Sequence, residues 1–381
     1  MKYKLKDICT KITDGSHNPP QGISDSPYLM LSSKNIADDS ITYDNPRYLT
    51  EADFLLENKR TSIQEGDLLL TIVGTIGRVA VVSNIEKKLC LQRSVAVLKP
   101  KQDIVKSRYL MYYLQNMRPV LEAEAKGVAQ KGIYLKQVES IEVSVPSLSK
   151  QEEIVNNLDL VTQLLALQKM QLVHLDELVK SRFAELFDDG ESPIKTVEEL
   201  CSAIVDCPHT TPKYEGELKN PAIRTTEIKK GYIAWETMRY VSDEEYEERT
   251  ARLKPEMGDI VYGREGTFGN AAILPKGYNF CLGQRVMLLR PDYSKCTSEY
   301  LLYAVISDDV YRQAVGKNNA STVAHVNVKD VKQFKIPLPS FDKQNQFAAF
   351  VEQTDKSKLA VQNSIAELEE LKKSLVQKYF G

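Results

Sequence analysis

The sequence predicts an α+β fold of two similar mixed α/β domains. Each is followed by a long helix, and the helices form an antiparallel coiled coil with pseudo-twofold symmetry. One observation is an internal repeat: the string GDLLLTIVGTIGR at residues 66–78 returns as GDIVYGREGTFGN at 258–270. The other is a heptad pattern of apolar residues after each copy, which is typical of long paired helices. A repeat of 192 residues is a whole domain, because solenoid repeats have periods of about 20 to 50 residues.

The repeat extends beyond the glycine-rich string. The same offset of 192 residues relates Cys9 to Cys201, Asp14 to Asp206, His17 to His209, Pro20 to Pro212, Gln92 to Gln284 and Arg93 to Arg285. Two similar domains on one chain indicate either one partner with two similar sites or two copies of one partner.

The composition is that of a globular protein. Of the 381 residues, 42% are hydrophobic and 27% are charged, which allows real hydrophobic cores. The net charge of −2 argues against a histone-like basic field but not against local basic faces. The six cysteines show no C-x-x-C pair, so we expect neither a disulfide framework nor a zinc site. We find no signal peptide and no membrane span, and we expect a cytoplasmic protein.

Changes in the sequence pattern set the expected domain boundaries. The four expected parts are a first domain at 1–148, a first helix at 149–188, a second domain at 189–340 and a second helix at 341–381. Short β-type runs bounded by Gly, Pro and Asn are found at 67–73, 79–82, 95–98 and 141–146. A helix is expected over 107–126, where Tyr109 and Tyr113 share one face with two leucines.

Each long helix is expected to carry an apolar seam with residue spacings of four and three. The first seam consists of Ile154, Leu158, Val161, Leu165, Gln168, Leu172, Leu175, Val179, Arg182 and Leu186. The second consists of Phe347, Val351, Thr354, Lys358, Val361, Ile365, Leu368, Lys372, Leu375 and Tyr379. Isolated helices are marginal, so we expect the two to bury their seams against each other. The alternative is that each helix folds back on its own domain.

Two further features of the helices concern their contacts. The polar residues Gln168, Arg182, Lys358 and Lys372 either set the register of the pair or lie where the seam meets solvent. A second apolar row on the first helix indicates another contact surface, for example for another subunit. This row consists of Leu160, Leu164, Leu167 and Leu178.

The chain shows only weak signals of catalysis. The string NPPQ at 18–21 lacks the aromatic residue that amino-methyltransferases stack on a flipped base. Asp206 with Glu227 and Lys229 has the pattern of a nuclease centre, but Asn35 stands in place of Glu227 in the first repeat. There is no P-loop, and the recurring histidines lack further ligands at metal-site spacing. We therefore expect neither a catalytic centre nor a metal site in this chain.

Several strings, taken in order, are similar to those of a known family. They are the domain openings LKDICTKITDGSHNPP and VEELCSAIVDCPHTTP, the strand-like YLMLSSKNI and PAIRTTEI, the two glycine-rich hairpins, and the helix entry GVAQKGIYLKQVESIEVSVPSLSKQEEIV. This arrangement resembles the specificity (S) subunit of type I restriction-modification enzymes. The resemblance covers essentially the whole chain, and the order of these motifs, given twice, is specific.

The resemblance implies a DNA-recognition subunit that has no catalytic activity of its own. Each target-recognition domain would read one half of a split, asymmetric site in double-stranded DNA, and the helices would set the unread spacer. Two methyltransferase (M) subunits would dock on the chain and supply S-adenosylmethionine chemistry on adenine, and restriction/translocase (R) subunits would join. The chain itself would bind no cofactor. The alternative function is a coiled-coil protein-interaction scaffold without DNA specificity.

Sequence readout needs hydrogen-bonding side chains on rigid turns, with phosphate-binding residues around them. In the first domain the polar candidates are Ser32, Ser33, Lys34, Asn35, Arg47, Lys59, Arg60, Arg78 and Arg93. In the second they are Arg224, Thr225, Thr226, Arg239, Arg264, Arg285, Lys317 and Asn318. For any one of these, a solvated surface charge is an equal alternative. The recurring Gln-Arg pairs suit a structural or phosphate-binding role better than the reading of unlike half-sites.

Overall fold

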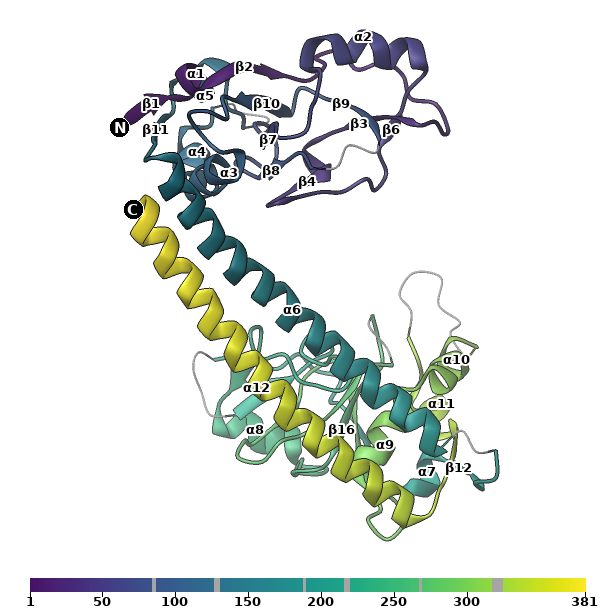
Figure 1. The fold of residues 1–381 in the computed structure, drawn as a ribbon. Coiled ribbons are helices and arrows are strands. Elements are labelled where there is room, and N and C mark those ends of the chain that lie inside the picture. The colour runs from purple at the N-terminus through teal and green to yellow at the C-terminus, as the bar shows by residue number, and fades with distance from the viewer. Residues whose placement is uncertain (84–86, 127–130, 188–189, 216–219, 267–268, 317–324) are drawn as a thin grey trace. The chain divides into compact units, whose positions relative to one another are not determined.

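The computed structural model describes residues 1–83, 87–126, 131–187, 190–215, 220–266, 269–316 and 325–381. The chain forms two compact units (Figure 1). The first unit contains residues 1–168 and 364–381, and the second contains residues 169–363. Both long helices therefore contribute to both units.

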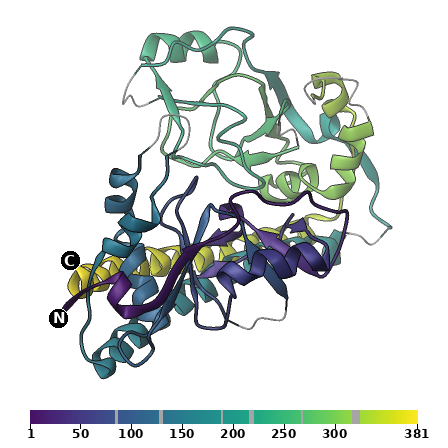
Figure 2. The ribbon, with the colours of Figure 1, turned by 90° about the horizontal axis from the view of Figure 1, so that it is seen from above.

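The first unit alternates short strands with helices (Figure 2, purple to blue). Its strands are β1 (Lys2–Lys4), β2 (Cys9–Asp14), β3 (Tyr28–Leu31), β4 (Ile36–Ala37), β5 (Ser40–Ile41), β6 (Arg47–Tyr48), β7 (Leu68–Thr71), β8 (Val79–Val81), β9 (Lys88–Leu91), β10 (Val95–Pro100) and β11 (Glu142–Ser144). Its helices, apart from the long pair, are α1 (Leu5–Ile8), the 3-10 turn η1 (Ser33–Asn35), α2 (Glu51–Thr61), α3 (Ser107–Asn116), α4 (Arg118–Glu124) and α5 (Leu135–Ser140).

A four-stranded antiparallel sheet in the order β2-β10-β7-β8 forms the centre of the first unit. Side chains alternate between the two faces of a strand, and both faces of this sheet are buried. Leu68 and Leu70 pack with Leu110 of α3 on one face. Leu69 and Val97 pack on the other face against the smaller sheet β6-β3-β9. This packing explains why the central strands are almost continuously apolar.

The second unit repeats this plan. Its strands are β12 (Ile194–Thr196), β13 (Cys201–Asp206), β14 (Asn220–Ile223), β15 (Arg239–Val241), β16 (Ile260–Gly263), β17 (Ala271–Ile273), β18 (Cys281–Leu282), β19 (Val286–Pro291) and β20 (Lys335–Pro337). Its shorter helices are α7 (Val197–Leu200), α8 (Asp243–Thr250), α9 (Ser298–Val305), α10 (Asp308–Gly316) and α11 (Val328–Lys332). The order β13-β19-β16-β17 is that of the first central sheet, strand for strand. The sequence repeat is therefore a repeat of topology.

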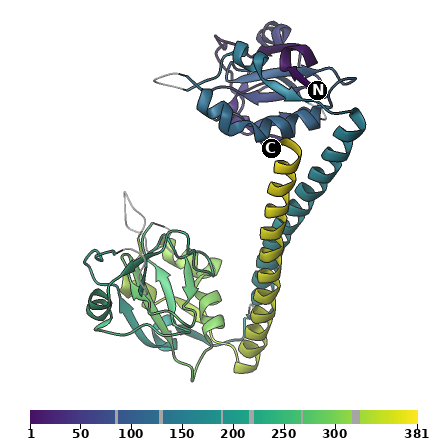
Figure 3. The same cartoon turned by 90° about the vertical axis from the view of Figure 1, so that its left-hand side faces the viewer.

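The two long helices are α6 (Leu148–Phe187) and α12 (Phe341–Phe380), of 40 residues each. They run side by side in Figures 1 and 3. In the first unit, Leu158 near the start of α6 shares a core with the last turns of α12, and Asn157 Nδ2 donates to Tyr379 Oη at 3.0 Å. In the second unit, Phe187 at the end of α6 contacts Phe347 at the start of α12, with ring centroids 5.4 Å apart. The helices are thus antiparallel in both units, as predicted.

The two expectations for the long helices, pairing with each other and packing on a domain, both hold. Each helix also packs on a domain at each of its ends. Ile154 of α6 belongs to the core of the first unit, and Val179 belongs to that of the second.

Among the described residues, no helix has the length and apolar character needed to cross a membrane.

Two polar seam residues have defined partners within the second unit. Lys358 Nζ on α12 lies 2.7 Å from Asp176 Oδ1 on α6, so this residue ties the two helices together at one register. Arg182 pairs with Glu185 on its own helix at 2.7 Å. The second apolar row of α6 is exposed: Leu160 is 57%, Leu164 38%, Leu167 61% and Leu178 50% exposed.

The helix expected over residues 107–126 differs from the structure. Two helices, α3 and α4, occupy this region and are separated at Met117. Pro119 in the first turn of α4 explains the break, because proline lacks the N–H that a continuous helix would need there. All four expected strands of the first domain are present. The strands expected at 67–73, 79–82 and 141–146 are shorter by one to three residues, whereas the strand expected at 95–98 extends to Pro100.

Candidate nucleic-acid interface

In the first unit, the polar turn after β3 is built by two of its own side chains. Ser32 Oγ accepts from the Lys34 N–H at 3.4 Å, and Asn35 Oδ1 accepts from the Ser32 N–H at 3.0 Å. Asn35 Nδ2 also donates to Asp44 O at 2.9 Å, and Asn35 is buried. Ser32 and Asn35 therefore hold the turn in shape, while Lys34 extends into solvent.

The glycine-rich turn after β7 lies against this polar turn. Thr75 Oγ1 is 3.4 Å from Ser33 O, and the Ser33 N–H donates to Ser94 Oγ at 3.0 Å. Gly74 has a φ of +85°, and a Cβ added there would lie 3.3 Å from Ser33 Oγ. Glycine thus allows the two turns to approach closely. Gly74 and Thr75 are exposed, so backbone and hydroxyl groups reach solvent at this corner.

Basic side chains surround the glycine-rich turn. A hollow of about 430 Å³ is lined by Gly74, Thr75, Ile76, Arg78, Arg118, Glu122 and Lys131. Arg118 Nε donates to Gly77 O at 3.2 Å, and its Nη2 pairs with Asp38. Arg78 and Lys131 supply further positive charge at the rim. Such a corner, with exposed backbone, a hydroxyl group and cations, suits contact with a phosphate backbone.

The other candidates of the first unit lie in different settings. Arg47 Nη1 donates to Pro20 O at 2.6 Å and holds the proline-rich loop. Arg60 pairs with Asp14. Lys59 and Arg93 are exposed. Gln92 and Arg93 lie beside the loop after β2, because the Arg93 N–H donates to Ser16 O at 2.9 Å.

In the second unit, the predicted residues after β14 surround a buried carboxylate. Arg224 Nε and Nη2 donate to the two oxygens of Glu227 at 3.0 and 2.5 Å. Thr226 Oγ1 donates to Glu227 Oε1 at 2.7 Å, and Thr225 lies half-buried beside it. Burial opposes the charge of Glu227, but hydrogen bonds from Arg224 and the neighbouring threonines outweigh it and hold its pKa below the usual value. Glu227 is thus an internal anchor, which agrees with our rejection of a nuclease centre.

The aromatic ring of Tyr214 lies close to the guanidinium groups of two arginines. Arg224 lies 5.7 Å and Arg239 5.0 Å from the centre of its ring, which is within range of a cation–π contact. Arg239 is exposed, whereas Arg224 is largely committed to Glu227. The exposed guanidinium of Arg239 is therefore the group best placed here to meet a ligand.

The remaining candidates of the second unit differ in accessibility. Arg264 is 9% exposed, and its Nη2 pairs with Asp206 Oδ1 at 2.8 Å, so its setting is internal. Arg285 has a left-handed φ of 65° and pairs with Glu265 at 3.0 Å, with 60% of its side chain exposed. Lys317 and Asn318 lie outside the described residues. Within the described part of the chain, no group of three or more His, Cys, Asp or Glu could hold a metal ion.

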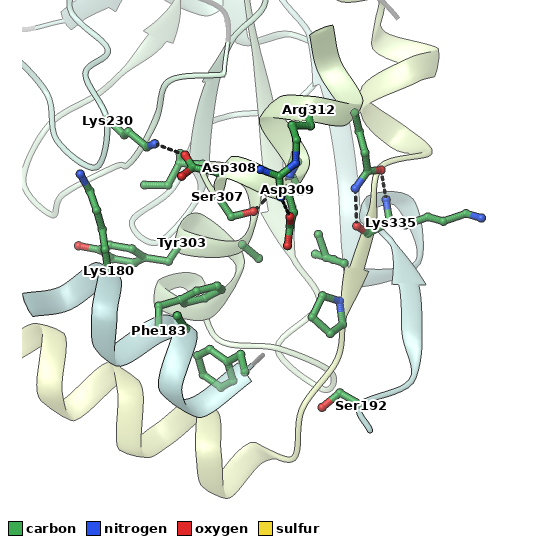
Figure 4. Close-up of a pocket in the computed structure, with 18 of the residues that line it drawn as sticks. Lys180, Phe183, Ser192, Lys230, Tyr303, Ser307, Asp308, Asp309, Arg312 and Lys335 are labelled. Atoms are coloured by element: carbon green, nitrogen blue, oxygen red, sulfur yellow. Dashed lines mark hydrogen bonds and ion pairs between the residues drawn. The ribbon is translucent and has the colours of Figure 1, made fainter. Parts of the chain in front are cut away.

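A larger hollow of about 1350 Å³ lies elsewhere in the second unit, between the end of α6 and helices α9 and α10 (Figure 4). Phe183 and Tyr303 supply aromatic surface, and Lys230 pairs with Asp308 at 3.4 Å. None of the predicted DNA-contacting residues lines it. It is therefore separate from the Arg224 and Arg239 group.

Sequence reasoning missed several residues that shape these sites. Tyr214, Arg118 and Lys131 stood in no recognised pattern. The position of Arg264 did carry a signal, because Ile72, which is 192 positions earlier, is a buried residue directly after the central strand β7. An arginine at a core position of the repeat is expected to find an internal partner.

Comparison with known proteins places the chain in a family. The family model described as "Type I restriction modification DNA specificity domain" matches residues 1–176 and 211–372. The chain belongs to this family. The two matched ranges contain the first repeated domain, the second from residue 211 onward, and most of both long helices.

Curated relatives are specificity subunits. The type I restriction enzyme EcoBI specificity subunit of Escherichia coli is 33% identical over 106 residues, which cover 27% of this chain and 22% of the relative. The MjaVIII specificity subunit of Methanocaldococcus jannaschii is 22% identical over 324 residues, covering 79% and 75%. The match to a putative MjaX specificity subunit from the same organism spans only 31% of that protein.

Solved structures share the fold. The S subunit of the type I restriction-modification system from M. genitalium aligns with a TM-score of 0.59 and 14% identity, covering 100% of this chain and 96% of that chain. A chain from a study of complex assembly and conformational transition of a type I R-M system also gives 0.59, at 16% identity and 100% and 97% coverage. At these identities the likeness concerns the fold.

Proposed function

We propose that this chain is the DNA-recognition subunit of a type I restriction-modification complex and that it has no catalytic activity of its own. Each repeated domain reads one half of a split, asymmetric site in double-stranded DNA. Family membership, the doubled topology and the polar turns of the two units support this role.

The observation that carries the proposal is that like positions of the two units hold unlike exposed groups. The polar turn after β3 presents Lys34, whereas the turn after β14 surrounds Glu227 and is flanked by exposed Arg239. Two copies of one scaffold with different surface chemistry suit a target made of two different halves. A protein-interaction scaffold would not need hydrogen-bonding turns repeated in this way.

The partners follow from the same assignment. We propose that two methyltransferase subunits dock on the chain, that S-adenosylmethionine binds to them, and that restriction/translocase subunits join the assembly. The exposed row of Leu160, Leu164 and Leu167 on α6 provides apolar surface for such contacts. With a net charge of −2, the chain alone should bind DNA modestly, and partner subunits would supply further basic surface. The cytoplasmic location stays a prediction.

A domain exchange tests the proposal. Residues 1–148 are replaced by the corresponding domain of another specificity subunit, and the hybrid is co-expressed with the methyltransferase subunit. Sequencing of modified adenine should show one changed half-site and one unchanged half-site. If both halves changed, or neither did, the assignment of one half to each domain would be wrong. A stable complex that modifies no specific sequence would favour the scaffold.

A further inference from the structure

Asp14, Arg60 and His17 form a connected group at the end of β2 in the first unit. Arg60 Nε donates to Asp14 O at 3.0 Å, and its Nη2 donates to Asp14 Oδ1. His17 Nε2 lies 2.8 Å from Asp14 Oδ2. A carboxylate oxygen only accepts, so His17 Nε2 carries the hydrogen. One carboxylate thus holds two side chains, through one oxygen each.

The group combines a buried anchor with accessible donors. The Asp14 side chain is 8% exposed, whereas those of Arg60 and His17 are each 50% exposed. A guanidinium has five N–H groups in a rigid plane. Two of them point to Asp14, and the other three have no partner among the described residues. The outer edge of Arg60 therefore presents a fixed fork of donors to solvent.

The backbone around Arg60 is also held. Arg60 lies in the last turn of α2, which Thr50 caps at the start by accepting from the Asp53 N–H. Lys11 Nζ donates to Arg60 O at 2.5 Å. Because helix, carbonyl and guanidinium are all fixed before binding, little conformational entropy remains to be lost when a ligand arrives.

The second unit shows that the fold does not require this arrangement. Asp206 recurs at the position of Asp14, but its partner is the internal Arg264. Helix α8 starts in the register of α2 but ends at Thr250, so Arg252, the counterpart of Arg60, lies beyond its end. The aspartate is present in both units, but only in the first unit does it bind an exposed guanidinium, that of Arg60.

We infer that Arg60, oriented by Asp14 and flanked by His17, binds a pair of hydrogen-bond acceptors on the DNA of the first half-site. This inference rests on the proposed function. Two sources offer the required chemistry: the O6 and N7 atoms of a guanine edge, or two oxygens of one phosphate. Asp14 acts through Arg60 and is a positioning residue.

The test uses the assembled complex of this chain with its methyltransferase subunit. Binding is measured on the cognate duplex, on duplexes with each single base pair of the first half-site changed, and at several salt concentrations. The variants are Arg60→Lys, which keeps the charge but loses the fork, and Arg60→Ala. Lys6→Ala removes an exposed charge from α1, which belongs to neither this group nor the predicted DNA contacts, and serves as the control.

If Arg60 contacts guanine, both Arg60 variants weaken cognate binding by roughly 5- to 150-fold and no longer discriminate at one G·C pair. If it contacts phosphate, Arg60→Ala weakens binding to all duplexes equally and lowers the salt slope by about 0.9, while Arg60→Lys restores the slope. Unchanged affinity and unchanged salt slope in both variants would overturn the inference.

The role of Asp14 is tested by Asp14→Asn, alone and combined with Arg60→Ala. The single variant should weaken the same discrimination or salt slope, and it should have no further effect in the Arg60→Ala background. Losses of affinity that add up in the double variant would show that Asp14 does not act through Arg60.

Thermal unfolding identifies variants that fail to fold. If the wild-type complex binds no specific sequence, the proposed function fails; if it does and the Arg60 variants match it, only this inference fails.

Discussion

Gln151 and Gln344, 193 residues apart, make the same three hydrogen bonds in the first turns of α6 and α12. Gln151 Oε1 accepts from the Lys106 N–H at 2.8 Å, and its Nε2 donates to Ile104 O and Pro146 O at 3.0 and 2.9 Å. Both glutamines are fully buried. Each one therefore joins the start of a long helix to two backbone segments of its own domain.

Gln344 repeats the arrangement in the second unit. Its Oε1 accepts from the Thr297 N–H at 2.9 Å, and its Nε2 donates to Lys295 O and Pro339 O at 3.2 and 3.0 Å. The segments before α3 and α9 are thus fixed to α6 and α12 in the same way. A fixed helix entry is what a ruler between two reading domains requires.

Replacing Gln151 with alanine should lower the free energy of unfolding by about 2–4 kcal/mol, because it leaves three buried backbone groups without partners. Chemical denaturation measures the change. Gln163→Ala, at an exposed position of the same helix, is the matched control and should change stability by less than about 0.5 kcal/mol. Equal effects of the two substitutions would show that the buried hydrogen bonds contribute little.

A second prediction concerns the glycine-rich turn after β7. Gly77 has a φ of +83°, and an added Cβ would lie 2.8 Å from Arg118 Cγ. Gly77→Ala should therefore cost more than the backbone strain of about 1–2 kcal/mol alone. Gly266→Ala separates the two contributions, because Gly266 has a φ of +70° and no atom within 4 Å of an added Cβ. If both variants lost the same stability, Arg118 would not restrict the turn.

The pH dependence of stability should involve Glu199 in the second unit. The Thr196 N–H and the Lys195 ammonium group hydrogen-bond to its carboxylate and lower its pKa to about 2. Because the folded pKa lies below the unfolded value, the contribution is present above pH 4.5 and is lost as the pH falls toward 2. Glu199→Gln should flatten the acid limb of a pH–stability curve. The exposed Glu236→Gln serves as control, and an unchanged limb in Glu199→Gln would refute the assignment.

Lys131 at the rim of the hollow beside Thr75 should contact phosphate. Lys131→Ala is expected to lower the slope of log affinity against log salt by about 0.9 without changing the modified DNA motif. Binding titrations of the complex at several salt concentrations measure this. Lys6→Ala removes an exposed charge from α1, outside that hollow, and should leave the slope unchanged. A changed motif in Lys131→Ala would mean that Lys131 reads a base instead.

The ruler role can be tested by length. One heptad added to each long helix keeps the seam in phase and lengthens the pair by about 10 Å at 1.5 Å per residue. At 3.4 Å per base pair, the unread spacer should grow by roughly three base pairs while both half-sites stay the same. Sequencing of modified adenine reads out the spacer. An unchanged spacer in an active complex would contradict the ruler.

The repeat and the seams could be predicted from the sequence because they are periodic. The offset of 192 residues reappears as the strand order β2-β10-β7-β8 and β13-β19-β16-β17. The seam positions Ile154 and Phe347 are buried. Such patterns are fixed by which side of an element faces the core, and a single sequence records this directly.

The site was harder to predict because exposure depends on contacts between distant segments. Asn35 is polar and follows a strand, as a residue that reads DNA bases would, yet its side-chain amide is buried and donates a hydrogen bond to the Asp44 carbonyl. The orientation of Arg60 depends on Asp14, 46 residues earlier, and on where α2 ends. Neither relation has a local signature. The recurrence of Asp14 and Asp206 marked the position as important but did not indicate which arginine each would hold.

Two unlike domains that read two halves of one DNA site, at a distance fixed by the helices, should leave a characteristic pattern of methylation. A methylome tests it most directly. This chain is co-expressed with its methyltransferase subunit in a host without adenine methylation, and modified adenines are sequenced. We expect one split motif of two unlike halves around a spacer of constant length. A continuous motif, or two halves at variable spacing, would contradict it.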